Sequence, residues 1–149
     1  MNWNNNVSIR LSQGCIIAFA VVLLFCDCFA FRIVRILPGI ENTTEGSRTG
    51  LMVCIYLLSV PAWFLLVEMW RLLRNISRGD VFTTENVSLL RWISICCAAA
   101  VVFGLVGTFF YHPMVILAVA AAFMMLIVRI VRNVFRQAVE MRNELDLTI

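Results

Sequence analysis

Four long apolar segments dominate the sequence and limit what the chain can fold into. They cover about residues 11–31, 50–70, 92–111 and 113–131. As helices, these segments match the roughly 20 residues that cross a hydrocarbon layer of about 30 Å. Hydrophobic residues make up 62% of the chain and charged residues 14%, whereas a soluble domain has about 45–50% and about 25%. The sequence therefore predicts a single all-α domain over residues 1–149, an integral membrane four-helix bundle with short loops and an amphipathic C-terminal helix.

Small residues recur on the third and fourth segments. Ala100, Gly104 and Thr108 repeat every four residues, and Ala118 and Ala122 repeat in the same way. Small side chains at this spacing let two helix backbones approach closely in lipid. We therefore expect the third and fourth spans to pack against each other through these two faces.

The twelve basic residues are all arginines, and their distribution predicts the orientation of the chain. Three of them, Arg32, Arg35 and Arg48, fall in the expected first loop, residues 32–49. The other nine fall on the opposite side of the four spans. Short loops rich in arginine stay in the cytoplasm, so we expect both termini and the central loop, residues 71–91, to be cytoplasmic.

The stretch from Gly79 to Arg91 has the features of a turn between two helices. Gly79 is suited to the left-handed conformation that ends a helix. Thr83 is a good N-cap, and Glu85 would lie in the first turn of the next helix. Phe82 and Val87 have the spacing of a hydrophobic staple. The stretch is either a plain connection or part of a binding surface.

The tail, residues 132–149, continues the fourth span as an amphipathic helix. The amphipathic pattern already begins in the last residues of the span: its apolar side carries Val131, Val134, Phe135, Ala138, Met141 and Leu145, and its polar side carries Arg129, Arg132, Arg136, Glu140 and Asn143. Such a helix lies on the membrane surface, packs on the central loop or binds a partner.

The sequence shows no arrangement of catalytic or metal-binding residues. Its single histidine, His112, falls in an outer turn, and there is no glycine-rich phosphate loop or zinc motif. The six cysteines lie in apolar runs without a Cys-x-x-Cys pair, which is typical of thiols that pack as small hydrophobic groups. We therefore expect no enzyme activity, no catalytic residue, no metal and no cofactor.

Two acidic residues fall within the apolar segments, where ionisable groups are often functional. Asp27 is close enough to the outer end of its span to pair with an arginine of the first loop. Glu68 stands three residues before Arg71, near the inner end of the second span. Both a structural role and an ion-coupled role remain open for these two residues.

Two stretches resemble a bacterial family of four-span membrane proteins, the domain of unknown function 2975. The loop of that family typically reads Gly-x-hydrophobic-Phe-Ser/Thr-x-x-Asn followed by Leu-Arg or Leu-Lys, and its members end in Glu-Asn-Asp-Leu-Thr-Ile/Val. The matching residues here are Gly79, Val81, Phe82, Thr83, Asn86, Leu90 and Arg91, and then Glu144 to Ile149. Leu145 and Asn143 depart from the family pattern and make this tail less acidic.

The resemblance implies a multi-pass protein of the bacterial inner membrane, but no catalytic mechanism. Members are often encoded beside a small helix-turn-helix transcription regulator, which implies an anchor or regulator of such a cytoplasmic partner. The alternative is a small transporter or channel, which would need to form a homo-oligomer. We expect contacts with the lipid bilayer and no direct nucleic-acid binding. The candidate partner-binding residues are Gly79, Phe82, Thr83, Asn86, Arg91, Phe135, Met141, Glu144, Asp146, Leu147, Thr148 and Ile149.

Overall fold

The computed structural model describes residues 3–37 and 45–147, and four α-helices account for nearly all of them. The helices are α1 (Trp3–Ile36), α2 (Glu45–Ser77), α3 (Thr84–Thr108) and α4 (Met114–Leu147). Each contains a segment long and apolar enough to cross a membrane. The all-α, four-span architecture is therefore confirmed.

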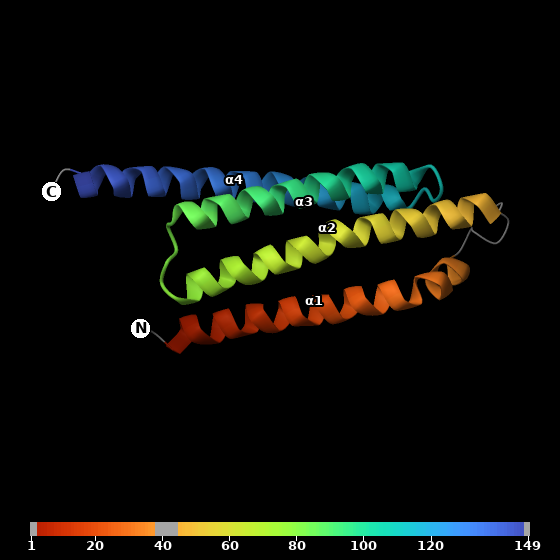
Figure 1. The fold of residues 1–149 in the computed structure, drawn as a ribbon, viewed down its shortest axis with the longest axis horizontal. Helices are drawn as coiled ribbons and strands as arrows, with labels where there is room; N and C mark the ends of the chain where they lie inside the picture. The colour runs from red at the N-terminus through yellow and green to blue at the C-terminus, as the bar shows by residue number, and fades with distance from the viewer. Residues whose placement is uncertain (1–2, 38–44, 148–149) are drawn as a thin grey trace.

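The helices lie side by side in the order of the chain (Figure 1). Over the described residues, Cα atoms approach within 8 Å between α1 and α2, between α2 and α3 and between α3 and α4, but between no other pair of helices. The start of α1, the connection from α2 to α3 and the end of α4 lie at one end of the molecule, which we call the loop end. The end of α1, the start of α2 and the turn from α3 to α4 lie at the far end.

The tail is an uninterrupted part of α4. This helix has 34 residues, which corresponds to a length of about 51 Å at 1.5 Å per residue. A hydrocarbon core is only about 30 Å thick, so a large part of α4 must extend beyond it. Figure 1 shows the last turns of α4 projecting past the start of α3 at the loop end.

The predicted bounds of the first loop, residues 32–49, are wrong at both ends, because α1 continues to Ile36 and α2 already begins at Glu45. Local side-chain contacts accompany both extensions. The guanidinium of Arg35 lies 4.0 Å from the ring centroid of Phe31. The guanidinium of Arg48 lies 3.5 Å from the carboxylate of Glu45. Arg32, Arg35 and Arg48, which were expected in a loop, therefore belong to the two helices.

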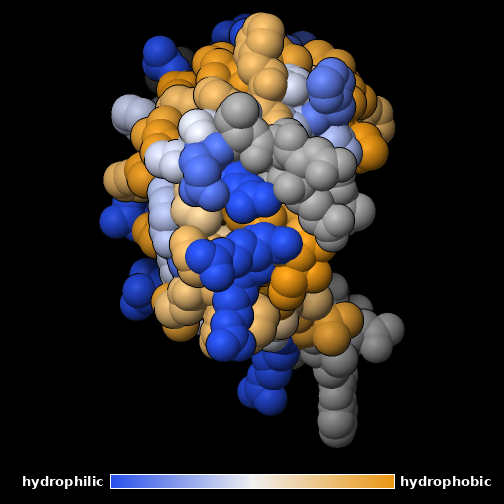
Figure 2. Space-filling view, turned by 90° about the vertical axis from the view of Figure 1, so that its right-hand side faces the viewer, coloured by the Kyte–Doolittle hydropathy of each residue, from blue (hydrophilic) through white to orange (hydrophobic). Residues whose placement is uncertain are grey.

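A small core joins the elements at the far end. Val34 of α1 and Leu51 of α2 are completely buried, and Phe110 of the α3–α4 turn and Met114 at the start of α4 pack against them. A Cβ atom at Gly50 would overlap the ring of Phe110, so this position allows the ring to lie on the α2 backbone. Figure 2 views the far end, where hydrophilic surface interrupts the hydrophobic surface of the helices.

Helices α3 and α4 approach closely through small residues, as the sequence predicts. Gly104 and Ala118 are both buried. A Cβ atom at position 104 would lie 3.1 Å from Cβ and 3.2 Å from Cα of Ala118. Because a backbone atom is among these neighbours, the glycine sets the distance between the two helices.

Large hydrophobic side chains cover the outside of the molecule. Phe19, Phe64, Ile116 and Phe123 each have at least 60% of their surface exposed. Exposed apolar side chains of this kind on all-helical spans are suited to contact with lipid chains. The chain is therefore a multi-pass membrane protein with apolar outer surfaces that face the bilayer.

Candidate functional site

The connection between α2 and α3 at the loop end begins with a Schellman motif. Gly79 has a φ of +90°, the left-handed conformation that was predicted for it. Its N–H donates to the carbonyl of Ile76 over 3.1 Å, and the N–H of Asp80 donates to the carbonyl of Asn75 over 3.2 Å. These two bonds satisfy carbonyls that would otherwise be unpaired at the end of α2.

The start of α3 is capped as predicted. Thr83 has an extended backbone with φ −124° and ψ 152°, and its side chain accepts a hydrogen bond from the N–H of Asn86 over 3.3 Å. Glu85 lies in the first turn of α3. The sequence motif from Gly79 to Asn86 therefore contains both the signal that ends one helix and the signal that begins the next.

Asn86 ties the connection to both helices. Its side chain is completely buried. Its Nδ2 donates to the carbonyls of Asp80 and Val81 over 2.7 and 2.8 Å. Its Oδ1 accepts a hydrogen bond from Nδ2 of Asn75 over 3.0 Å. These bonds lie inside the chain, so the Asn86 side chain shapes the connection and is not available at the surface.

The aromatic ring of Phe82 links the connection to the tail. Its centroid lies 5.4 Å from that of Phe135 on α4, and the two rings are inclined by 52°. This distance is typical of aromatic pairs that attract each other. The staple between Phe82 and Val87 stays a prediction, and the ring contact found in the structure is with Phe135.

The other candidate partner-binding residues fall into two groups. Gly79, Arg91, Met141 and Glu144 are exposed at or near the loop end. Asp146 and Leu147 belong to α4, but the described side chains stop before them, and Thr148 and Ile149 lie outside the described residues. Of the predicted set, the structure thus brings together the loop residues and Phe135.

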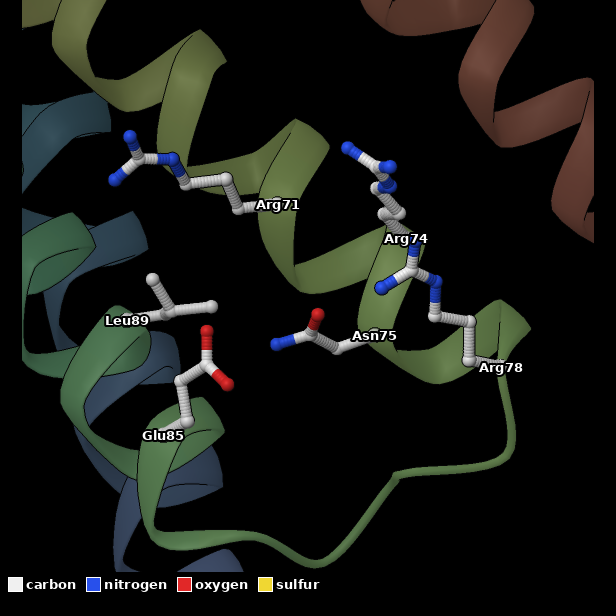
Figure 3. A pocket seen from close by; sticks show the side chains of 6 residues that line it. All are labelled: Arg71, Arg74, Asn75, Arg78, Glu85 and Leu89. Atoms are coloured by element: carbon white, nitrogen blue, oxygen red, sulfur yellow. The ribbon is translucent and has the colours of Figure 1, made fainter.

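A pocket of about 290 Å³ opens between the end of α2 and the start of α3 (Figure 3). Arg71 contacts Glu68, with 3.4 Å between guanidinium and carboxylate, so the pair suggested by the sequence spacing is confirmed. The Glu68 side chain is only 14% exposed, and within the described structure its second oxygen has no hydrogen-bond partner. The pocket is lined by Arg71, Arg74, Asn75, Arg78, Glu85 and Leu89.

Asp27 of α1 accepts hydrogen bonds from uncharged side chains of α2. Its Oδ1 accepts a hydrogen bond from the hydroxyl of Ser59, and its Oδ2 accepts one from the indole N–H of Trp63 over 3.1 Å. The hydroxyl of Tyr56 donates to the Asp27 backbone carbonyl over 3.4 Å. The Asp27 carboxylate was expected to pair with an arginine of the first loop. In the structure, hydrogen-bond donors of α2 bind it instead.

Sequence reasoning did not identify the donors that bind Asp27, or Asn75 as the partner of Asn86. Tyr56, Ser59 and Trp63 are spaced by three and four residues, which places three donors on one face of α2. That spacing is a usable signal in an apolar segment. Asn75 carries no comparable signal, because a polar residue between arginines is ordinary at the end of a helix.

Comparison with known proteins gives a family but no characterised relative. No match was found among curated proteins or among solved structures. The family described as "Protein of unknown function (DUF2975)" matches residues 15–149, which include all of α2, α3 and α4. Because this match covers most of the sequence, the chain belongs to the DUF2975 family of membrane proteins.

Proposed function

We propose that the chain is a membrane anchor or regulator that binds a cytoplasmic protein partner at its loop end. The observation that carries this role is the contact between Phe82 and Phe135. It joins the α2–α3 connection to the tail of α4, so that two segments far apart in the sequence form one surface. We call the surface formed by Phe82, Phe135, Met141 and Glu144 the docking surface.

The docking surface combines apolar and charged groups outside the expected span. Phe82 is 43% exposed and Met141 is 60% exposed. Glu144 is exposed one turn further along α4. Aromatic and methionine side chains are enriched in protein interfaces, and polar groups surround them at the rim. The role proposed for this surface is binding and not catalysis.

The arginine distribution supports a cytoplasmic loop end in a bacterial inner membrane. The loop end receives the arginines of the start of α1, the end of α2, the α2–α3 connection, the start of α3 and the later part of α4, whereas Arg32, Arg35 and Arg48 belong to the far end. The rule for positive residues then places the docking surface in the cytoplasm. A small helix-turn-helix transcription regulator is the partner that the family resemblance favours.

A transporter or channel has less support in this arrangement. The described parts of the helices form a row in which only consecutive helices bring Cα atoms within 8 Å of each other, so one chain does not surround a path. Asp27, a candidate ion-coupled group, already has both carboxylate oxygens bound to neutral donors. Homo-oligomers would be required for transport, and the docking surface does not depend on them.

Co-purification tests the proposed role. The full chain would be co-expressed with the small regulator and captured from membranes after crosslinking, as wild type, Phe82→Ala and Met141→Ala. We expect each change to lower the yield of regulator at least five-fold. Phe123→Ala is the matched control, since this residue of α4 is 63% exposed and lies in the apolar part of the helix. Undiminished yields with both altered proteins would show that the docking surface is not used.

A further inference from the structure

The pocket between α2 and α3 has a positive charge that the described residues do not balance. Arg71, Arg74 and Arg78 are spaced by three and four residues and therefore share one face of α2. Arg71 has a partner in Glu68. Arg74 and Arg78 form no ion pair with any carboxylate in the part of the chain that the structure describes. Like charges one turn apart repel each other, so this face favours the arrival of an anion.

The charge count indicates a ligand with a single negative charge. Three arginines of the pocket stand against two carboxylates, Glu85 in its wall and Glu68 beside Arg71. They leave one positive charge. A guanidinium group binds phosphate oxygens with paired hydrogen bonds, and a phosphodiester carries one negative charge. The chemistry that the pocket fits is therefore a phosphodiester.

The position of the pocket points to a phospholipid as the source of that group. Trp70 directly precedes the arginines on α2, and Trp92 follows the pocket residue Leu89 on α3. These indoles are 37% and 55% exposed. Tryptophan gathers at the level where hydrocarbon meets headgroups, so the pocket lies just outside that level. Basic pockets between membrane helices at this depth bind lipid headgroups.

The walls of the pocket also suit a lipid. Figure 3 shows Arg74 and Arg78 on one side, Glu85 and Leu89 on the other, and the Asn75 amide between them. Leu89 is 7% exposed and gives the pocket an apolar wall. The volume of about 290 Å³ lies just below the range of about 300–1,000 Å³ for small-molecule sites. A headgroup with its glycerol fits this size better than a larger cofactor.

We propose that the pocket formed by Arg71, Arg74, Arg78 and Glu85 binds the headgroup phosphodiester of one anionic phospholipid. The arginines supply the attraction, and Glu85 limits the net charge to one. The site lies on α2 and α3, whereas the docking surface lies on the α2–α3 connection and the tail of α4. The two sites can therefore be tested independently.

Native mass spectrometry of the full chain tests this site. Delipidated protein in a non-ionic detergent would be titrated with dioleoyl phosphatidylglycerol, and with dioleoyl phosphatidylcholine as the zwitterionic control. We expect one tightly held phosphatidylglycerol and at least ten-fold weaker binding of phosphatidylcholine. Equal binding of the two lipids would overturn the proposal.

Matched variants assign the binding to the pocket. Arg74→Gln and Arg78→Gln should each weaken phosphatidylglycerol binding about five-fold, the factor that corresponds to roughly 1 kcal/mol per arginine at a membrane surface. Glu85→Gln should strengthen binding, because it removes a negative charge that faces the anion. Arg129→Gln makes the same change at an exposed arginine of α4 and should leave the affinity within two-fold of wild type.

A conservative variant separates loss of the site from loss of the fold. Arg74→Lys keeps the charge and should retain more binding than Arg74→Gln, while both proteins keep the helical circular dichroism of wild type. Wild-type affinity in the double variant Arg74→Gln, Arg78→Gln would overturn the proposal. Displacement of the lipid by millimolar glycerol phosphate would overturn the proposal that the ligand is a phospholipid. It would show that the pocket binds soluble phosphate esters.

Discussion

Asn75 of α2 donates a hydrogen bond from Nδ2 to Oδ1 of Asn86 on α3, with 3.0 Å between the two atoms. The Asn86 side chain is completely buried, and its Nδ2 donates to two carbonyls of the connection. One side chain therefore joins the end of α2, the connection and the start of α3. This explains in physical terms why an asparagine stands at this place in the loop motif.

Asn86→Ala is expected to destabilise the loop end more than any change at an exposed residue of the connection. It removes the only side-chain donor that the described structure gives to the carbonyls of Asp80 and Val81, and an unsatisfied buried polar group costs about 1–3 kcal/mol. Unfolding in mixed dodecyl maltoside and SDS micelles would measure the loss. Ser88→Ala, an exposed position on the same helix, is the control. Equal stability of Asn86→Ala and wild type would contradict the role given to Asn86.

Gly104→Val is expected to separate α3 from α4. The first added carbon already lies 3.1–3.3 Å from three atoms of Ala118, two of them in the backbone. Overpacking of this kind costs about 1–3 kcal/mol, which the same micelle assay would detect as unfolding at lower SDS.

Gly14→Ala provides the contrast for this glycine test. Nothing lies within 4 Å of a Cβ atom at Gly14, so the alanine should be neutral or stabilising through its better helix propensity. A loss at Gly14→Ala as large as that at Gly104→Val would show that close packing between α3 and α4 is not the cause of the effect.

Asp27→Ala is expected to weaken the contact between α1 and α2. It leaves the Ser59 hydroxyl and the Trp63 indole N–H without their acceptor, at a cost of about 1–3 kcal/mol. Asp27→Asn keeps an acceptor oxygen and should lose less. Tryptophan fluorescence during unfolding reports both values, and Cys28→Ala, at an exposed neighbouring position, is the control.

The same position also tests the alternative function. If Asp27 only joins two helices, Asp27→Asn in reconstituted vesicles should leave ion permeability unchanged. A proton-dependent flux that this substitution removes would instead assign Asp27 an ion-coupled role and favour the transporter.

The orientation of the chain is expected to follow its arginines. Single cysteines would be placed at Glu45, Asp80 and Asn143 after replacement of the six native cysteines, and treated with a membrane-impermeant maleimide. All three positions are exposed. In intact cells we expect labelling at position 45 only, with labelling at 80 and 143 after permeabilisation. The reverse pattern would place the docking surface outside the cell.

Much of the fold was determined by sequence alone, because each feature depends on neighbours along the chain. The apolar segments predict four helices by length and hydropathy. Gly79 and Thr83 predict the end of α2 and the start of α3 through local backbone chemistry. The predicted first loop included residues 32–36 and 45–49, which in the structure continue the helices.

Only the tertiary structure determined which distant side chains meet. Phe82 could pack on Val87 or on the tail, and the position of α4 beside the α2–α3 connection places it on Phe135. Asp27 had an arginine within reach along the sequence, but the alignment of α1 with α2 gives it Ser59 and Trp63. Local chemistry sets helix ends, whereas the rotation and depth of each helix against its neighbour depend on packing along their whole length.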